Sequence, residues 1–449
     1  MRMHGPGAAV LLAAVIGLAA CGPSSDSGAG SSGSGTETRE LLVWDTGILG
    51  RTLDNGDADM ENSFIDQMAA KFEDANPGVT VKVVQQGGDI TANGAQFQAA
   101  SIAGDGPDVR IQYAGGPTLS FAEFFTDLEP LLTPEIIDSM AGFNVNREGF
   151  EPDGRILGMP YGAGNLFTVF QNHAVLEEAG LDPADPPQTW EELIANGQQV
   201  VDATDKNGFW VANLEGYTGA WMISALVGGE LGESAFTQMY AGEIRVDDPA
   251  MVKADQAFAD CGTSGLTNPD AGQVSNGDST AGFVSGGSAY YLVGSWENNN
   301  MLEAFGEDGV SSFFIPTLEG SAHPNIGAGG PEIAISVTEY SKNKELAGEF
   351  LRFLAEPENQ DVFVELYQTQ GSNHRDGDPS KIQNPLLRAQ FEELAEASDG
   401  VTFAFDSVMP QATIDLFYRV NAAVFLGTTT PQDAVNQLQA SYEQEIALQ

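Results

Sequence analysis

Strand-like and helix-like segments alternate at the start of the folded body, and this order constrains the fold most. Residues 41–45 (Leu-Leu-Val-Trp-Asp) form a short apolar run, and residues 79–83 alternate valine with polar residues, as strands do. Between them, residues 64–72 place a large apolar side chain every four positions, which predicts a helix. A Gly-Asp-Gly-Pro turn at 104–107 leads into another strand candidate at 108–113. The alternation predicts an α/β fold with a largely parallel sheet.

The length of the chain requires two lobes. Its 449 residues are 42% hydrophobic and 18% charged, which suits a globular protein but exceeds what one hydrophobic core holds. A second lobe begins near Asn165. There, residues 189–192 have the spacing of a capping box, and residues 249–262 predict a helix that buries Cys261. Residues 289–293 predict a strand, and the end of the chain is mainly helical in pattern.

The first residues have the pattern of a secretion signal. The apolar run at 8–20 has 13 residues, too few for a helix that spans a bilayer. It ends in Leu-Ala-Ala before Cys21, which resembles the bacterial lipobox, in which the cysteine is acylated after cleavage of the leader. We predict a lipoprotein signal peptide and lipobox at 1–21, with lipidation on Cys21; a plain secretory signal is the alternative. Residues 22–39, rich in glycine and serine, predict a flexible linker.

The charge of the chain excludes several classes of partner. Sixty-four acidic residues against 18 basic ones give a net charge of −46. Such a surface repels nucleic acid and anionic lipid, and it disfavours anionic ligands at long range. We interpret the many acidic residues as a means of keeping the protein soluble, for example in a salty habitat. With Cys261 as the one cysteine outside the leader, no internal disulfide is expected.

The sequence contains no persuasive motif for a metal, a cofactor or catalysis. A calcium loop around residues 202–214 fails because its first and last ligand positions are Ala203 and Leu214. The four histidines include no pair with the spacing of a metal site. A glycosidase would use a pair of carboxylates, but a chain with 64 acidic residues contains such pairs by chance, so they are no evidence for this activity. A structural adhesin would need repeats, which are absent. We therefore expect no metal, no cofactor and no enzymatic activity.

Short segments across residues 40–360 occur in the order found in a known family. The segments are 42–45 (Leu-Val-Trp-Asp), 72–79 (Phe-Glu-Asp-Ala-Asn-Pro-Gly-Val), 106–109 (Gly-Pro-Asp-Val), 127–130 (Asp-Leu-Glu-Pro), 158–161 (Gly-Met-Pro-Tyr), 178–181 (Glu-Ala-Gly-Leu), 187–193 (Pro-Gln-Thr-Trp-Glu-Glu-Leu), 294–296 (Gly-Ser-Trp), 314–316 (Phe-Ile-Pro) and 341–345 (Ser-Lys-Asn-Lys-Glu). Through these segments the chain resembles family 1 extracellular solute-binding proteins, the maltose-binding-protein-like receptors of carbohydrate ABC importers. It departs from the family at residues 171–173, where Gln-Asn-His replaces the usual aromatic-Asn-Lys.

The resemblance implies a type II periplasmic-binding-protein-like fold. Two α/β lobes with mixed sheets are joined by a hinge of three chain crossings, and ligand lies in the cleft between the lobes. By family placement, the crossings are expected near residues 162–166, 313–317 and 353–357. Lobe 1 then comprises residues 40–164 plus 317–354, and lobe 2 comprises residues 165–316 plus 355–449.

The resemblance also implies a function. The chain is expected to be a monomeric, lipid-anchored receptor on the extracellular face of the bacterial cytoplasmic membrane, which is periplasmic if the cell has an outer membrane. It would capture a sugar, an oligosaccharide, and pass it to the membrane subunits of an ABC permease. A receptor for a polyamine or another small solute is the alternative, because polyamine sites place acids between aromatics, which such a cleft could offer.

Aromatic and amide side chains at strand ends are the candidate ligand contacts. A sugar presents flat C–H faces and hydroxyl rims, so its site needs aromatic faces and polar partners. Trp296 directly follows the strand at 289–293, and in the family the aromatic of this Gly-Ser-Trp segment often stacks on sugar; a packing role is the alternative. The remaining candidates are Trp44, Asp45, Gln112, Tyr113, Tyr161, Asn165, Tyr217, Trp221, Glu332 and Tyr418.

Overall fold

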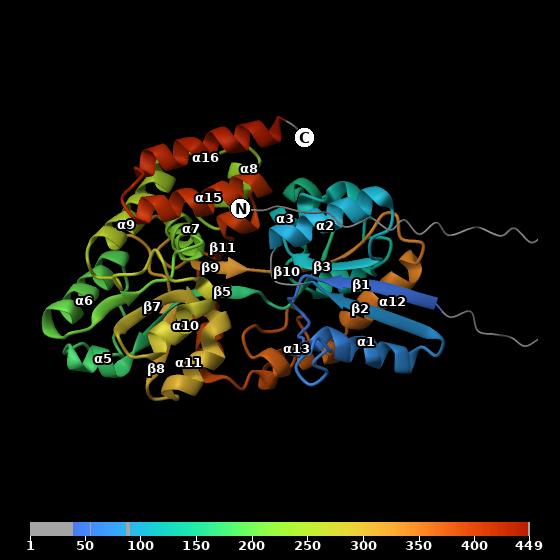
Figure 1. Cartoon of the computed structure of the whole chain (residues 1–449), viewed down its shortest axis with the longest axis horizontal. Helices are drawn as coiled ribbons and strands as arrows, with labels where there is room; N and C mark the ends of the chain where they lie inside the picture. The colour runs from blue at the N-terminus through green and yellow to red at the C-terminus, as the bar shows by residue number, and fades with distance from the viewer. Residues whose placement is uncertain (1–38, 54, 87–89, 448–449) are drawn as a thin grey trace, which may run out of the picture. The chain divides into compact units, whose positions relative to one another are not determined.

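Two mixed β-sheets organise the part of the chain that the computed structural model describes, residues 39–53, 55–86 and 90–447 (Figure 1). The described residues belong to one compact unit. The predicted leader, Cys21 and all but the last residue of the predicted linker lie outside them. Within the described residues, every helix is too short or too polar to cross a bilayer.

The first sheet has the strand order β2-β1-β3-β10-β4. Strand β1 pairs in parallel with β2 and β3, whereas β10 is antiparallel to both β3 and β4. The strands predicted at 41–45, 79–83 and 108–113 are confirmed, and so is the helix predicted over 64–72. The strands are β1 (Arg39–Asp45), β2 (Val79–Gln85), β3 (Val109–Tyr113), β4 (Met159–Tyr161) and β10 (Ile333–Val337).

The second sheet has the order β11-β9-β5-β7-β6, with β8 paired to β5. Its central strand β5 is antiparallel to β7, β8 and β9, while β6 is parallel to β7. Strand β7 contains the predicted strand at 289–293. The strands are β5 (Asn165–Asn172), β6 (Asn207–Trp210), β7 (Ser288–Gly294), β8 (Val310–Phe314), β9 (Gly327–Gly330) and β11 (Val401–Thr402).

The helices pack around the two sheets and give each its own hydrophobic core. The larger core includes α7, α9, α15 and α16, with α15 and α16 side by side (Figure 1). The helices are α1 (Phe64–Ala75), α2 (Ile90–Ala103), α3 (Gly116–Leu119), α4 (Pro134–Ser139), α5 (His173–Glu178), α6 (Trp190–Ala203), α7 (Tyr217–Leu231), α8 (Ala235–Tyr240), α9 (Pro249–Thr263), α10 (Asn276–Val284), α11 (Asn298–Phe305), α12 (Lys344–Leu354), α13 (Pro357–Tyr367), α14 (Pro385–Glu396), α15 (Gln411–Phe425) and α16 (Pro431–Ile446).

The chain passes between the two sheets along three segments within the described residues. The first passage, residues 162–164, joins β4 to β5 and lies where the sequence predicts it. The second passage is 331–332, between β9 and β10, because the glycine-rich strand β9 pairs with β5 and β11. The third passage runs through 368–384, because Phe363 and Val364 of α13 still belong to the first core. The later two lie further along the chain than 313–317 and 353–357, and we propose lobe boundaries that follow these pairings.

Two details at helix ends follow the sequence. Thr189 accepts a hydrogen bond from the backbone N–H of Glu192, as the capping box predicts, but the Glu192 carboxylate accepts from Gln188 N–H instead of reaching Thr189. Cys261 is buried in α9, and burial raises the pKa of its thiol to about 12, so it behaves as a small apolar side chain. The helix ends one residue beyond Gly262, at Thr263.

Backbone contact between the lobes also occurs outside the passages. Gly115 precedes α3 with φ +72°, and a Cβ there would overlap the carbonyl oxygen of Ser407. A Cβ on Gly116 would likewise overlap the carbonyl oxygen of Met409. Only glycine permits this approach, because any side chain would push the two segments apart.

One buried acid in the second lobe carries a stability cost. Asp255 of α9 is fully buried, and neither carboxyl oxygen has a hydrogen-bond partner among the described residues. Burial raises its pKa from 3.8 to about 8. The unfolded chain therefore releases this proton at a lower pH than the folded chain does. Between about pH 4 and pH 8, the contribution of Asp255 to folding stability therefore falls as pH rises.

We predict that Asp255→Asn removes this pH dependence. At pH 7.5 the variant should be more stable than the wild type by on the order of 5 kcal/mol, since the wild type must take up a proton to fold, at about 1.4 kcal/mol for each pH unit above 3.8. At pH 4 the difference should vanish. Urea denaturation at several pH values measures the effect, with the exposed Asp260→Asn of the same helix as control. An unchanged pH profile in Asp255→Asn would contradict the assignment.

Candidate ligand site

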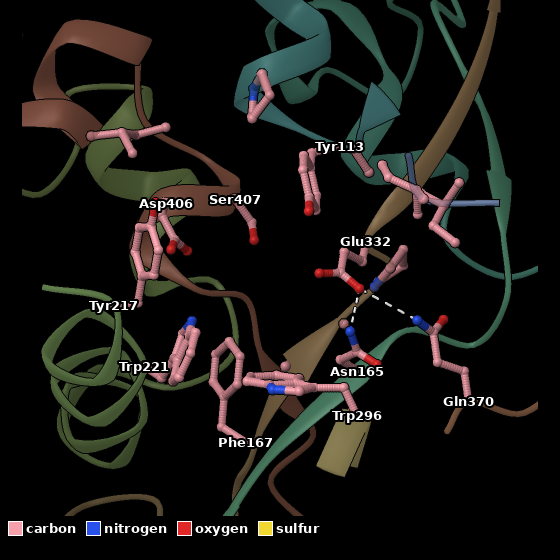
Figure 2. Close-up of a pocket in the computed structure, with 18 of the residues that line it drawn as sticks. Tyr113, Asn165, Phe167, Tyr217, Trp221, Trp296, Glu332, Gln370, Asp406 and Ser407 are labelled. Atoms are coloured by element: carbon pink, nitrogen blue, oxygen red, sulfur yellow. Dashed lines mark hydrogen bonds between the residues drawn. The ribbon is translucent and has the colours of Figure 1, made fainter. Parts of the chain in front are cut away.

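A cavity of about 710 Å³ is lined by residues of both lobes. It brings together seven of the residues that the sequence predicts as ligand contacts, and Figure 2 shows six of them, all but Tyr418, around one space. The seven are Tyr113, Asn165, Tyr217, Trp221, Trp296, Glu332 and Tyr418.

Aromatic rings from the second lobe form one wall of the cavity. Trp221 of α7 is central: its ring meets Trp296 edge-on at 4.6 Å between centroids and stacks on Tyr217 at 6.3 Å. Phe167 of β5 stacks on the other side of Trp221 at 6.0 Å, and Tyr418 of α15 packs edge-on against Tyr217 at 4.8 Å. Because these rings contact one another, they form one continuous apolar surface.

The position of Trp296 follows from the local sequence. Strand β7 is buried along its whole length and ends at Gly294, directly before the 3₁₀ turn η4 (Ser295–Glu297). A Cβ on Gly294 would overlap the Trp296 ring, so glycine lets the indole fold back over the strand end. Ser295 Oγ accepts a hydrogen bond from Leu166 N–H at 3.1 Å and fixes the turn to β5. The turn therefore aims Trp296 into the cavity.

Opposite the rings lies a polar side centred on Glu332. Its Oε2 accepts hydrogen bonds from Asn165 Nδ2 and, at 3.3 Å, from Gln370 Nε2 (Figure 2). The pKa of Glu332 is raised to about 7: burial is the largest cause, the nearby charge of Asp406 adds to the rise, and the two amide hydrogen bonds oppose it. Near neutral pH this group is therefore poised between its two protonation states.

Asp406 and Tyr113 add two further polar groups to the cavity, and Asp406 lies beside Tyr217 of the aromatic wall (Figure 2). Asp406 Oδ2 accepts a hydrogen bond from Tyr418 Oη at 2.9 Å, and burial raises its pKa to about 6. The pKa of Tyr113 lies well above its usual value, first because the phenol is buried and second because Glu332 is close. Tyr113 is therefore a neutral hydroxyl that can donate or accept.

The charges of the lining favour a ligand without negative charge. Among the described residues that line the cavity, Arg419 is the one basic side chain, against the carboxyl groups of Glu332, Asp406 and Asp415. Arg419 is exposed at the cavity edge, and Asp415 accepts from Gln411 Nε2 at 2.9 Å. An anion would meet more acid than base at this surface.

Two candidates from the first strand lie outside the cavity. Asp45 is fully buried and accepts hydrogen bonds from the N–H groups of Ile48 and Leu49, so it closes the turn after β1. Burial raises its pKa to about 6. Trp44 packs against the small cluster that contains Phe97. Both were expected in the cleft, and both instead stabilise the first lobe.

Gln112 and Tyr161 also lie outside the cavity. Gln112 is buried within the sheet and donates to Ser336 Oγ of the neighbouring strand at 3.3 Å. Tyr161 is fully buried and donates to the Leu354 carbonyl at 3.1 Å, with its ring against Phe64. Strand alternation explains both positions: each residue belongs to a strand end, but its side chain faces the core of the lobe.

Several lining residues carried no usable signal in the sequence. Phe167 reads as one more apolar residue of a buried strand, and Asp406 is one of 64 acids. Gln370 lies in the irregular third passage, where no periodicity marks a position. Tyr367, which donates to the Leu49 carbonyl at 2.9 Å, reads as part of the apolar face of α13. Only the path of the chain through the passages brings these residues to the cavity.

The family follows from comparison with known sequences. A family model described as bacterial extracellular solute-binding protein matches residues 67–379. The chain belongs to this family. A galactooligosaccharide-binding protein of Bacillus subtilis is 26% identical over 389 residues, covering 86% of this chain and 84% of the relative. An sn-glycerol-3-phosphate-binding periplasmic protein of Agrobacterium fabrum is 24% identical, covering 56% of this chain and 59% of the relative.

Solved structures confirm the predicted fold class. A chitin oligosaccharide binding protein superimposes with a TM-score of 0.77 at 19% identity, covering 91% of this chain and 99% of the other. A solute-binding protein solved in complex with raffinose gives a TM-score of 0.66 at 18% identity, covering 90% and 98%. This solute-binding protein therefore shares the two-lobed type II architecture.

We predict that Gly294→Ala displaces Trp296 from the aromatic wall. The added methyl overlaps the indole, so the Trp221–Trp296 pair should separate. The near-ultraviolet circular dichroism of this pair should fall to the level of Trp296→Phe, while the far-ultraviolet spectrum is kept. Gly277→Ala is the matched control, because its Cβ would meet only Ser275 Oγ at 3.9 Å. A wild-type near-ultraviolet spectrum in Gly294→Ala would refute the placement of Trp296.

Proposed function

We propose that this solute-binding protein captures a neutral oligosaccharide in the cavity and delivers it to the membrane permease of an ABC importer. The observation that carries the proposal is a continuous wall of aromatic rings facing carboxyl, amide and phenol groups across about 710 Å³. Rings match the C–H faces of a sugar, and the polar side matches its hydroxyls. The names of the Bacillus subtilis relative and of the chitin oligosaccharide binding protein agree with this cargo.

The lining charge argues against a phosphorylated cargo, although some relatives are named for sn-glycerol-3-phosphate. A phosphate would meet three carboxyl groups and one exposed arginine. A polyamine would suit the acids and could lie against the rings, but its thin chain would cover less of the aromatic wall than the flat face of a sugar ring does. The neutral sugar uses both sides of the cavity, so it is the cargo we propose.

We propose that the chain binds without catalysis and acts as a monomer at the cell surface. The matched family and the named relatives are binding proteins. Incubation with the bound oligosaccharide should leave its chain length unchanged. Chromatography of the sugar before and after incubation checks this expectation.

We predict that a neutral oligosaccharide raises the melting temperature and that Trp296→Ala weakens its binding about a hundredfold. The loss corresponds to removal of one buried aromatic contact. The screen should include galacto-oligosaccharides, chito-oligosaccharides, raffinose, a polyamine and sn-glycerol-3-phosphate, and titration calorimetry then gives affinities. Trp210→Phe is the control, since Trp210 donates to the Ser279 carbonyl and does not line the cavity. Tight binding of the polyamine or the phosphate, without sugar binding, would refute the proposal.

We further propose that Cys21 carries a lipid that tethers the protein to the extracellular face of the membrane. The proposal comes from Leu-Ala-Ala before Cys21 and the glycine- and serine-rich segment after it. Cys21→Ser should abolish acylation and leave the protein uncleaved or released. Detergent phase partition of the two forms measures this. Wild-type protein in the aqueous phase would mean that the leader is a plain secretory signal.

A further inference from the structure

The three passages between the sheets meet at one pair of side chains. Gln370 of the third passage accepts a hydrogen bond from Gly164 N–H of the first passage through its Oε1, at 3.2 Å. Its Nε2 donates to Glu332 of the second passage at 3.3 Å. Asn165, which follows the first passage, donates to the same Oε2 of Glu332. One carboxylate oxygen of the second passage thus accepts hydrogen bonds from two donors, Gln370 of the third passage and Asn165, which directly follows the first.

We call the hydrogen-bonded group of Gly164, Asn165, Glu332 and Gln370 the junction. Only one of the two Glu332 carboxyl oxygens takes part in it. The second oxygen, Oε1, has no hydrogen bond to a described residue and points toward the centre of the cavity (Figure 2). The two carboxyl oxygens therefore have different roles. Oε2 accepts the hydrogen bonds that link the passages, and Oε1 can accept a hydrogen bond from a ligand. The backbone carbonyl of Glu332 is fixed separately, by the N–H of Ala114 at 2.7 Å.

The surroundings of Glu332 make its ionisation sensitive to pH near neutrality. The titratable groups that act on it are acidic: Asp406 from the second lobe raises its pKa, and its own charge raises that of Tyr113 from β3. The other polar groups at the carboxyl are the neutral amides of Asn165 and Gln370. No described lysine, arginine or histidine forms an ion pair with Glu332.

We propose that Glu332 both contacts the ligand and positions its neighbours: its negative charge holds the three passages together and orients Asn165 and Gln370, so that protonation loosens the junction and weakens capture. This inference rests on the proposed function for the identity of the cargo, but not for the junction itself. An ionised carboxylate accepts both amide hydrogen bonds strongly. A protonated one offers a weaker acceptor and adds a donor, so Gln370 loses its anchor.

The direction of the pH effect follows from proton balance. The protonated form must lose one proton to the solvent before it can accept hydrogen bonds as a carboxylate from the junction and from a ligand hydroxyl. Ligand binding therefore releases a proton when the pH lies near or below the pKa of about 7. Affinity should rise with pH through this range and level off above it.

The junction is tested without any ligand through the amide of Gly164. Its hydrogen-exchange protection, corrected for the intrinsic effect of pH, should fall at least about threefold between pH 7.5 and pH 5.5, because the carboxylate anchor of Gln370 is lost. In Glu332→Gln the protection should be low and independent of pH. In Asp406→Asn the protection of the Gly164 amide should still fall as the pH is lowered, but the midpoint of the fall should lie at a lower pH. The reason is that this variant lacks the Asp406 charge, which raises the pKa of Glu332. The amide of Ala114 is an internal control, since its acceptor does not titrate.

Sugar binding is tested separately, with a galacto-oligosaccharide as the probe. Its dissociation constant should rise about tenfold from pH 7.5 to pH 5.5 in the wild type and less than about twofold in Glu332→Gln. Calorimetry in two buffers of different ionisation enthalpy should show proton release at pH 6.5. If the probe does not bind at any pH but the Gly164 effect is present, the proposed cargo fails and the junction stands. Unchanged Gly164 protection in the wild type, or an equal fall in Glu332→Gln, overturns the inference.

Discussion

A polypeptide that passes between two hydrophobic cores must satisfy its own polar backbone in the gap, and the rest of this structure depends on how it does so. The first passage turns at Gly162 and Gly164, both with positive φ. The N–H of Gly164 donates a hydrogen bond to the side chain of Gln370, and the amide of Gln370 donates one to Glu332. This chain of hydrogen bonds brings amide and carboxyl groups to the cavity, so the same residues that join the lobes also supply its polar side.

The aromatic wall is built from elements that belong to the hydrophobic core of the second lobe. Strand β5 supplies Phe167, the end of β7 supplies Trp296, and α7 supplies Tyr217 and Trp221. Each ring comes from an element that is buried in the second core, and the rings support one another at centroid separations of 4.6–6.3 Å. Side chains packed against one another in this way lose little conformational entropy on binding, which favours recognition of a flat, rigid ligand face.

The sequence predicted best where one short pattern determines one structure. The strand at 41–45 and the helix from Phe64 follow from periodicity, and Trp296 follows from a buried strand that ends in Gly-Ser-Trp. The sequence predicted worst where the position of a residue depends on the direction of its side chain or on pairing between distant segments. Trp44 lies in a correctly predicted strand but packs into the first lobe. The second passage was expected earlier by family placement, and β9, Gly-Ala-Gly-Gly, has no side-chain pattern in the sequence that marks it as a strand and so moves the passage to its observed place. Gln370 and Asp406 reach the cavity only through the folded path of the chain.

We propose that a neutral sugar binds between the aromatic wall and the Glu332 side of the cavity. A crystal structure of the protein with the oligosaccharide identified by thermal-shift screening tests this proposal most directly. We expect a sugar ring stacked on Trp221 or Trp296, with hydroxyl groups within hydrogen-bond distance of Glu332 or Asp406. A ligand bound elsewhere, or a sugar in the cavity without contact to either tryptophan, would contradict it.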